Sequence, residues 1–393
     1  MTRLWDKQEP LDQRILKFTV GDDPILDSRL VAYDVRASIA HTEMLCAKGY
    51  LTTEDKDAIA AGLKELGAAF ERGEWTISLD DEDCHTALES RLIKSIGTAG
   101  ERVHLGRSRN DQVLTAMRMY LRDAVDDIVQ GVAALDDTVE TLIERDGGIA
   151  IPGYTHMQPA MPSTVALWAE GYREGLQDAK SGLAAARARL NVNPLGTAAG
   201  YGTPGLDLDR EATTAALEFN AIQEPVTAAQ LSRGRAESAL VFELNLLLIG
   251  LGRMASDLLL FYTQEFGIIE LSTDTTTGSS IMPQKRNPDV LELIRAASAT
   301  VQGCLAECMT LVTKLPSGYQ RDLQRLKSPV FRAIDVAGAT LDAATTVIAK
   351  LRFDADAVNL DPSLYAAEEA YALVQQQGLT FREAYRQISK KFT

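Results

Sequence analysis

The sequence predicts an all-α fold whose centre is a bundle of long helices. Apolar residues recur at alternating steps of three and four from Leu114 to Leu142, and again from Leu240 to Phe261. This is the heptad spacing of helices that pack side by side. No stretch predicts a convincing strand. The chain has 393 residues, 46% of them hydrophobic, which is enough for a large core and more than one domain.

The N-terminal part is predicted to be helical after an irregular start over residues 1–26. Thr52 is a suitable N-cap and Gly49 a suitable helix stop. Residues 97–106 are expected to form a loop. The expected helices cover residues 30–48, 52–71 and 84–92.

Five long helices are predicted in the central part. Gly147 and Gly148 end the first, and Pro316 interrupts the chain before the last. Because helices this long bury their apolar seams better against copies of themselves, we expect a homo-oligomer. The five cover residues 109–146, 163–190, 240–261, 291–315 and 320–351.

A short helical appendage is predicted after Phe353. Its two helices, over residues 366–376 and 380–391, are joined at Gly378. Thr380 and Glu383 have the spacing of a capping box, which supports a helix start at that point.

Charge and cysteine content narrow the function classes. The formal net charge is −15, which disfavours non-specific binding to nucleic acid or to an anionic membrane. The four cysteines have no zinc-type spacing and read as core residues. We find no signal peptide and no apolar run of membrane-spanning length, so the cytoplasm is the expected compartment. No cofactor or metal is predicted. The cysteines are Cys46, Cys84, Cys304 and Cys308.

The 278–288 loop, Gly-Ser-Ser-Ile-Met-Pro-Gln-Lys-Arg-Asn-Pro, is unusual for a linker between helices. A serine can exchange a proton, Lys285 can neutralise a developing anion, and Asn287 can bind a carboxylate or amide. Together these groups can remove a proton next to a carboxylate and stabilise the product of that step. Its small and polar residues predict a mobile loop. A solvated connection is the plainer alternative.

Three other segments, around His85, Arg109 and His156, place polar groups in loops or at predicted helix ends. Arg109 and Asn110 lie at the start of a long helix, where arginine side chains and the helix N-terminus favour an anion. His156 is flanked by Thr155 and Gln158, which can form hydrogen bonds. A lone histidine is more often structural, and we leave His41 and His104 in that class. The Gly- and Thr-rich residues 193–205 lack the strand and lysine of a phosphate-binding loop, so that reading is rejected.

The 278–288 loop resembles the signature of the fumarase/aspartase superfamily, whose members eliminate fumarate from succinyl compounds. Three further strings, spread over most of the chain, narrow the resemblance to argininosuccinate lyases. The matching signature positions are Gly278, Ser279, Met282, Lys285 and Asn287, and the further strings begin at Gly106, Tyr154 and Leu315.

The resemblance implies three domains, which we place at residues 1–106, 107–353 and 354–393. It also implies a homotetramer with a shared central bundle, and active sites shared between subunits. The implied reaction is β-elimination of argininosuccinate to arginine and fumarate, in arginine biosynthesis.

The resemblance also assigns residue roles. Ser279 is the implied base, with Ser280 as its rival, and Lys285 and Asn287 stabilise the aci-carboxylate intermediate. His156 protonates the leaving nitrogen or organises the acid that does so, with Glu292 as its partner. The implied substrate contacts are His85, Arg109, Asn110, Thr155, Asn287, Tyr319, Gln324 and Lys327.

Two segments depart from the family pattern. The family often has a serine near Asp23 that touches the amino-acid end of the substrate, but residues 20–24 contain no serine and the contact has no counterpart in this string. Residues 230–235 also differ from the commoner Ser-Glu-Arg-Asp string. The alternatives are therefore a related lyase acting on another succinyl amine, or a non-catalytic structural homologue. The appendage is also shorter than usual.

Overall fold

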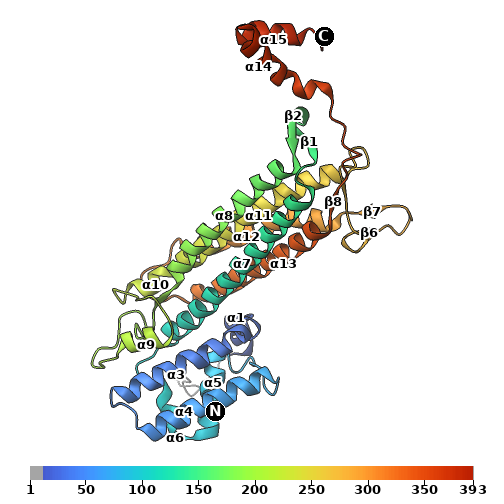
Figure 1. The fold of residues 1–393 in the computed structure, drawn as a ribbon. Helices are drawn as coiled ribbons and strands as arrows, with labels where there is room; N and C mark the ends of the chain where they lie inside the picture. The colour runs from blue at the N-terminus through green and yellow to red at the C-terminus, as the bar shows by residue number, and fades with distance from the viewer. Residues whose placement is uncertain (1–11, 393) are drawn as a thin grey trace. The chain divides into compact units, whose positions relative to one another are not determined.

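The computed structural model describes residues 12–392, and helices dominate it (Figure 1). The chain divides into two compact units. The first comprises residues 1–128, 182–244 and 301–335, and the second comprises residues 129–181, 245–300 and 336–393. The three-domain boundaries expected from the sequence remain a prediction.

The N-terminal helices all belong to the first unit. The helix predicted at residues 52–71 is confirmed, with the Thr52 side chain accepting the N–H of Asp55. The expected irregular start is wrong over residues 13–26, where Asp12 caps a helix; residues 1–11 lie outside the described range. The expected loop over residues 97–106 is also largely helical, in short turns. The elements are α1 (Gln13–Val20), α2 (Asp23–Leu26), η1 (Asp27–Leu30), α3 (Val31–Ala47), α4 (Thr53–Glu71), α5 (Cys84–Ile96), α6 (Thr98–Glu101) and η2 (Arg102–His104).

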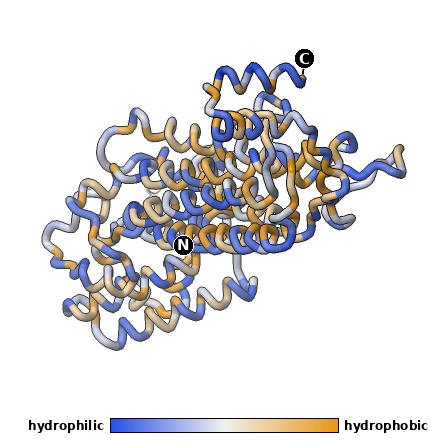
Figure 2. Tube along the Cα trace, turned by 45° about the horizontal axis from the view of Figure 1, so that its top comes forward, coloured by the Kyte–Doolittle hydropathy of each residue, from blue (hydrophilic) through white to orange (hydrophobic). Residues whose placement is uncertain are grey.

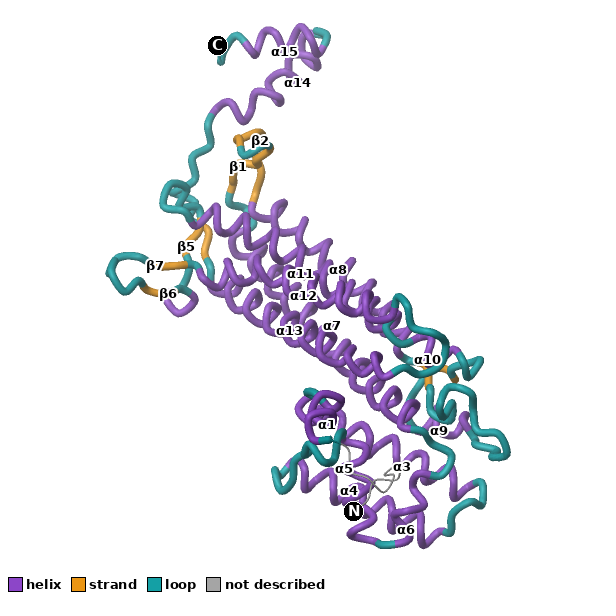
Figure 3. The backbone as a smooth tube through the Cα atoms, turned by 180° about the vertical axis from the view of Figure 1, so that it is seen from behind, coloured by secondary structure: helices purple, strands orange, loops and turns teal. Residues whose placement is uncertain are grey.

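The five predicted long helices are present, and each runs from one unit into the other. Within each unit their segments lie side by side (Figures 1 and 3). The last is shorter than predicted, because residues 321–326 form the 3-10 turn η4 (Arg321–Leu326) ahead of it. The five are α7 (Arg109–Asp146), α8 (Val165–Leu190), α11 (Arg235–Tyr262), α12 (Asp289–Val312) and α13 (Lys327–Lys350); α9 (Arg210–Ala216) and α10 (Ala228–Ser232) are short.

The heptad residues form the core, as predicted. Every heptad position from Leu114 to Leu142 on α7, and from Leu240 to Phe261 on α11, is buried. In the second unit, Leu258 of α11, Leu291 of α12 and Val347 of α13 line one small apolar space. Hydrophobic and hydrophilic residues alternate along these helices, as Figure 2 shows. The apolar seams therefore hold the segments of each unit together.

Residues 228–262, which contain α11, are long and apolar enough to span a membrane by length and composition, because they include an 18-residue window with a mean hydropathy of 1.6. The expectation that no run reaches that length is therefore wrong. Core packing accounts for the 56% of that window that is buried inside the protein, whereas Phe242, Leu246 and Ile249 are exposed in the single chain.

Short strands correct the expectation that the chain has none. Within residues 12–392, the one extended pair is β1 (Ala150–Thr155) with β2 (Gln158–Thr164), an antiparallel hairpin in the second unit. The sequence did not predict this hairpin because its strands contain prolines and a glycine, which are depleted in strands. The remaining strands have two residues each and are too short for any alternation. They pair β3 (Val192–Asn193) with β4 (Ala221–Ile222), β5 (Ile269–Glu270) with β8 (Arg352–Phe353), and β6 (Thr277–Gly278) with β7 (Arg286–Asn287).

The C-terminal appendage contains the two predicted helices, α14 (Ala366–Gln377) and α15 (Phe381–Ser389), after the short turn η5 (Pro362–Tyr365). Gly378 adopts a left-handed conformation with φ 66°, which suits a glycine at a helix end. The capping box of Thr380 and Glu383 is confirmed. Ala370, Ala384 and Ile388 form a small core between the two helices.

Candidate active site

The predicted site residues fall into two sets, one in each unit. The first unit holds His85, Arg109, Asn110, Tyr319, Gln324 and Lys327. The second unit holds Thr155, His156, Ser279, Lys285, Asn287 and Glu292. The geometry of each set is described separately.

In the second unit, the 278–288 loop is a hairpin-like excursion between β6 and β7, preceded by the turn η3 (Thr273–Thr275) (Figure 3). The Ser279 hydroxyl oxygen accepts the backbone N–H of Ile281 at 3.3 Å and that of Met282 at 3.1 Å. Ser280 is exposed. Backbone N–H donors favour a negatively charged oxygen, so this environment suits Ser279 better than Ser280 as a base.

The other loop residues lie on β7 and at the start of α12. The Asn287 amide donates to the carbonyl oxygen of Gly278 at 3.2 Å, which ties the two ends of the loop together. Lys285 is exposed, and so is Glu292 in the first turn of α12. The ammonium group of Lys285 therefore faces solvent, and the carboxylate of Glu292 follows it closely in the sequence.

Thr155 and His156 lie at the tip of the β1–β2 hairpin. Thr155 pairs with Gln158, and the two residues between them have positive φ, 52° at His156 and 60° at Met157. This is the conformation of a type I′ turn, in which Asn and Gly are the usual residues. Holding a histidine there costs of order 1 kcal/mol, a strain that is often retained at functional sites.

Four of the six predicted site residues in the second unit are open to solvent, and Ser279 and Asn287 are partly buried. Thr155, His156, Lys285 and Glu292 are all exposed in the single chain. Elimination through a carbanion benefits from a closed, water-poor site. This set therefore lacks the enclosure that its chemistry needs.

In the first unit, Lys327 lies at the start of α13 and is almost fully buried. Its ammonium nitrogen is 2.5 Å from a carboxylate oxygen of Asp27 and 2.7 Å from one of Asp23. Burial lowers the pKa of Lys327, but the two carboxylates outweigh burial and raise it. These three residues form the Lys327 cluster, in which two carboxylates share one cation and leave a net charge of −1.

His85 is buried beside this cluster. Its Nδ1 lies 3.1 Å from Asp34, and Gln112 donates to the same carboxylate at 2.9 Å. Burial alone would lower the pKa of His85, but Asp34, with Asp83 and Asp27, raises it. Its Nε2 is buried with no hydrogen-bond partner, so it can donate to a ligand.

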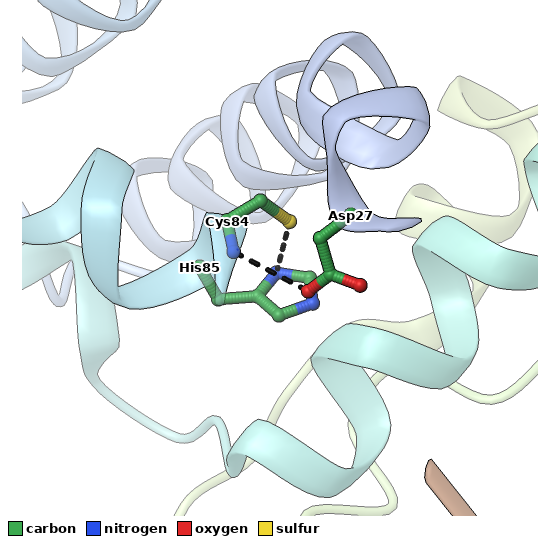
Figure 4. Close-up of side chains that lie close together, drawn as sticks. All are labelled: Asp27, Cys84 and His85. Carbon is green, nitrogen blue, oxygen red and sulfur yellow. Dashed lines mark hydrogen bonds between the residues drawn. The ribbon is translucent and has the colours of Figure 1, made fainter. Parts of the chain in front are cut away.

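Asp27, Cys84 and His85 offer three potential metal-ligand atoms within 4.8 Å of one another (Figure 4). The residues fit a metal poorly. Burial, reinforced by neighbouring carboxylates, raises the pKa of the Cys84 thiol well above its usual value, whereas a metal ligand must be a thiolate. Asp27 already binds the ammonium of Lys327, and the backbone N–H of Cys84 donates to its other oxygen at 3.3 Å.

Arg109 begins α7 and binds α5. Its guanidinium donates to Asp83 at 2.5 Å and to the Thr86 hydroxyl at 2.7 Å. Burial acts to raise the pKa of Asp83, but Arg109, His85 and the N–H of Thr86 overcome it and lower the pKa to about 2. The Nε of Arg109 is buried without a partner, which leaves one donor for a ligand. Asn110 is partly buried at the same helix start.

Tyr319 and Gln324 contact each other ahead of α13. The Gln324 amide nitrogen donates to the Tyr319 hydroxyl at 3.0 Å, and its amide oxygen is buried without a partner. The Arg233 guanidinium carbon lies 5.7 Å from the centre of the Tyr319 ring, a cation–π contact. The departure from the family string at residues 230–235 therefore adjoins predicted substrate contacts.

Sequence reasoning missed the carboxylates that organise the first unit's set. Asp27, Asp34 and Asp83 are the partners of Lys327, His85 and Arg109. One signal could have identified Asp34: it lies among apolar residues on α3, and a charged residue on the buried face of a helix needs a partner of opposite charge. Neither Asp27 nor Asp83 has such a signal, because Asp27 begins the short turn η1 and Asp83 is the N-cap of α5.

The Gly- and Thr-rich segment 193–205 has a structural role, in keeping with the rejection of a phosphate loop. The backbone N–H groups of Gly196 and Ala198 donate to Asp111 at 2.9 and 2.8 Å. Burial raises the pKa of Asp111 to about 6 despite these donors. A protein carboxylate therefore occupies the position that an anionic ligand would take.

Comparison with known proteins identifies what the chain is similar to. A family model described as "Lyase" matches residues 8–303. The argininosuccinate lyase of Sorangium cellulosum is 44% identical over 98% of this chain and 90% of its own length. That of Thermotoga neapolitana is 40% identical over 99% and 98%. Among solved structures, an EDDS lyase variant with bound fumarate has a TM-score of 0.82 and 26% identity, covering 97% of this chain and 76% of that one.

Proposed function

This chain belongs to the argininosuccinate lyase family of the fumarase/aspartase superfamily, a family of carbon–nitrogen lyases, and we propose that it converts argininosuccinate reversibly to arginine and fumarate. The observation that carries the proposal is the near full-length identity of 44% to an argininosuccinate lyase. The pathway that needs this reaction is arginine biosynthesis.

The proposed reaction begins at Ser279. Its oxygen removes the proton on the carbon next to the succinyl carboxylate, helped by the N–H donors of Ile281 and Met282 that favour the alkoxide. Lys285 and Asn287 then stabilise the aci-carboxylate. The carbon–nitrogen bond breaks as the electron pair returns to form the double bond of fumarate.

The leaving guanidino nitrogen needs a proton. His156 donates it or organises the donor, and Glu292 is the proposed partner of the histidine. The strained turn at His156 supports this role, because the backbone holds the imidazole at an exposed tip. The proposed substrate contacts are Thr155 and Asn287 in the second unit, and Arg109, Asn110, Tyr319, Gln324, Lys327 and His85 in the first.

We propose a homotetramer of three-domain subunits, with active sites completed by neighbouring chains. The exposure of His156, Lys285 and Glu292 in the single chain supports this arrangement, because a second chain can supply the missing enclosure. The protein is proposed to act in the cytoplasm and without a cofactor.

The test is product identification. Purified protein is incubated with argininosuccinate, and fumarate is followed by absorbance while arginine is quantified by chromatography. Equimolar fumarate and arginine are expected. Fumarate from adenylosuccinate, aspartate or malate, with none from argininosuccinate, would reassign the substrate within the superfamily.

A second candidate is a lyase for a different succinyl amine. The Asp23 and Arg233 departures favour it, since both adjoin residues proposed to read the end of the substrate remote from the succinyl group. The same panel of substrates separates the two candidates. No elimination from any of them would favour a non-catalytic homologue.

A further inference from the structure

The carboxylate of Asp111, in the first turn of α7, is completely buried and joins two segments of the first unit. Its Oδ1 accepts the backbone N–H of Ser108 at 2.9 Å. Its Oδ2 accepts the backbone N–H of Gly196 at 2.9 Å and that of Ala198 at 2.8 Å. One side chain therefore fastens the start of α7 to the segment of residues 193–205.

The bond to Ser108 fixes the turn that carries two of the proposed substrate contacts. The Ser108 hydroxyl accepts the backbone N–H of Asn110 at 3.3 Å, while Asp111 accepts the backbone N–H of Ser108, in the manner of a capping box. Arg109 lies within this turn, and its Nε is buried without a partner. The directions in which Arg109 and Asn110 project are therefore set by backbone that Asp111 holds.

The segment on the other side of Asp111 is folded around the carboxylate. Gly196 and Ala198 have positive φ, 87° and 49°. Backbone of this kind turns neighbouring N–H groups towards one point and forms a small anion-binding nest. Alanine rarely adopts this conformation, and such strain persists where the surrounding structure requires it. The nest therefore matches the Asp111 oxygen that it holds.

The same segment also reaches a second group of proposed substrate contacts. A Cβ built on Gly318 would lie 3.0 Å from the hydroxyl oxygen of Tyr201, so the phenol lies against this glycine. Gly318 directly precedes Tyr319, whose hydroxyl accepts a hydrogen bond from the Gln324 amide at 3.0 Å. Residues 193–205 therefore contact both the start of α7 and the segment that carries Tyr319.

The three partners of Asp111 explain why this position needs a carboxylate. All three are backbone N–H donors, and an ionised carboxylate only accepts hydrogen bonds. Asparagine has the same shape, but it would point its own N–H group at one of these buried donors, which would then be unsatisfied. Asp111 is itself too enclosed to touch a substrate, so any effect on binding must act through its neighbours.

We propose that Asp111 is a positioning residue, which holds Arg109 and Asn110 in the orientation that binds a carboxylate of the substrate. The inference rests on the proposed function, because these two residues are substrate contacts there. Small displacements matter at such a site, since a misplacement of 1 Å can cost about 100-fold in rate.

The first measurement is calorimetric titration of the full-length protein with succinate, which does not depend on turnover. Asp111→Asn should weaken succinate binding about tenfold or more. With argininosuccinate, KM should rise by a similar factor while kcat changes less than about threefold. This split is expected because the proposed proton-transfer residues, Ser279 and His156, belong to the other set. A merely structural role would lower the unfolding temperature and leave the succinate affinity of the folded protein unchanged.

Gly196→Ala breaks the same contact from the opposite side. An added Cβ would lie 2.9 Å from the Arg210 side chain, at a residue with positive φ, so the nest should distort while Asp111 stays intact. The same loss of succinate affinity is expected. This variant also decides the question if Asp111→Asn does not fold.

Asp209→Asn is the matched control, because it alters a carboxylate that caps a helix in the same unit. Asp209 is exposed and accepts the backbone N–H of Ala212 at 2.9 Å at the start of α9. Succinate affinity and KM should both stay at their wild-type values.

Three results would overturn the inference. One is unchanged succinate affinity in the folded Asp111→Asn and Gly196→Ala variants. Another is a wild type that does not bind succinate, and the third is a loss of kcat at unchanged KM, which would place Asp111 in the chemical step. Failure of the proposed function looks different, because fumarate release from argininosuccinate would be missing while the dependence of succinate binding on Asp111 is still measured.

Discussion

Lys327 and Asp27 form a buried ion pair, 2.5 Å between nitrogen and oxygen, across 300 positions of sequence. The pair joins the start of α13 to the N-terminal segment, and Asp23 binds the same ammonium. Two carboxylates that share one cation depend on it for their burial.

Lys327→Met should destabilise the protein strongly. Removing the cation leaves two buried carboxylates without compensation, which typically costs roughly 3–5 kcal/mol. Urea unfolding at pH 7 and fixed protein concentration measures the free energy of unfolding. Lys350→Met is the control, because it breaks a lysine–carboxylate pair with Asp274 that is exposed on both sides and should change stability little. Equal effects of the two variants would contradict the account.

The Asp83–Arg109 pair should make the free energy of unfolding depend on pH in the acidic range. The pKa of Asp83 is about 2 in the folded protein, against an ordinary value of 3.8. The folded state therefore binds the Asp83 proton less readily than the unfolded chain. The resulting stabilisation, about 2 kcal/mol, is complete above pH 4 and is lost as the pH falls towards 2.

Asp83→Asn tests this dependence, because an amide oxygen can still cap α5 through the N–H of Thr86. The difference in unfolding free energy between wild type and variant should be largest near neutral pH and shrink below pH 4. A difference that stays constant from pH 7 to pH 2.5 would exclude Asp83 as the titrating group.

Gly234→Ala should be costly for two reasons. Gly234 has φ +79°, and a Cβ built on it would lie 2.2 Å from a methyl carbon of Val312. Backbone strain and overpacking together predict a loss of roughly 2–4 kcal/mol. Gly303→Ala in α12 is the matched control, since no atom lies within 4 Å of its added Cβ. It should stabilise the helix by about 0.5–1 kcal/mol in the same thermal or urea unfolding assay.

His156→Asn separates chemistry from turn geometry. Asparagine tolerates the left-handed conformation at this tip, so the hairpin should remain intact. If His156 supplies or organises the proton, kcat for argininosuccinate cleavage should fall by about 10²- to 10⁴-fold. Met157→Asn changes the neighbouring turn residue in the same way and should keep near wild-type activity. Equal losses in the two variants would assign the effect to the turn.

The helical core could be predicted because its signal is local and repeated. Heptad spacing located the buried seams of α7 and α11, and a Thr-x-x-Glu string located the start of α15. The β1–β2 hairpin could not be predicted, since prolines in its strands contradict ordinary propensity and the pairing of the two strands satisfies the backbone instead. The short turns of residues 98–104 carry no periodicity at all.

The candidate site was predictable only in part. Ser279, Lys285 and His156 stand in unusual strings, so their residue types and spacing point to chemistry. Asp27 and Asp34 are distant along the chain from their partners Lys327 and His85. A single sequence does not show which buried charges form pairs in the folded protein. Asp23 could be noticed as a departure, but its bond to Lys327 required the fold.

The central claim is that Ser279 is the base of an argininosuccinate lyase. The most direct measurement is the rate of fumarate release from argininosuccinate by wild type, Ser279→Ala and Ser280→Ala, with folding checked by circular dichroism. We predict rapid release by the wild type, a loss of about 10³-fold or more in Ser279→Ala, and a much smaller loss in Ser280→Ala. Full activity in Ser279→Ala, or a greater loss in Ser280→Ala, would contradict the account.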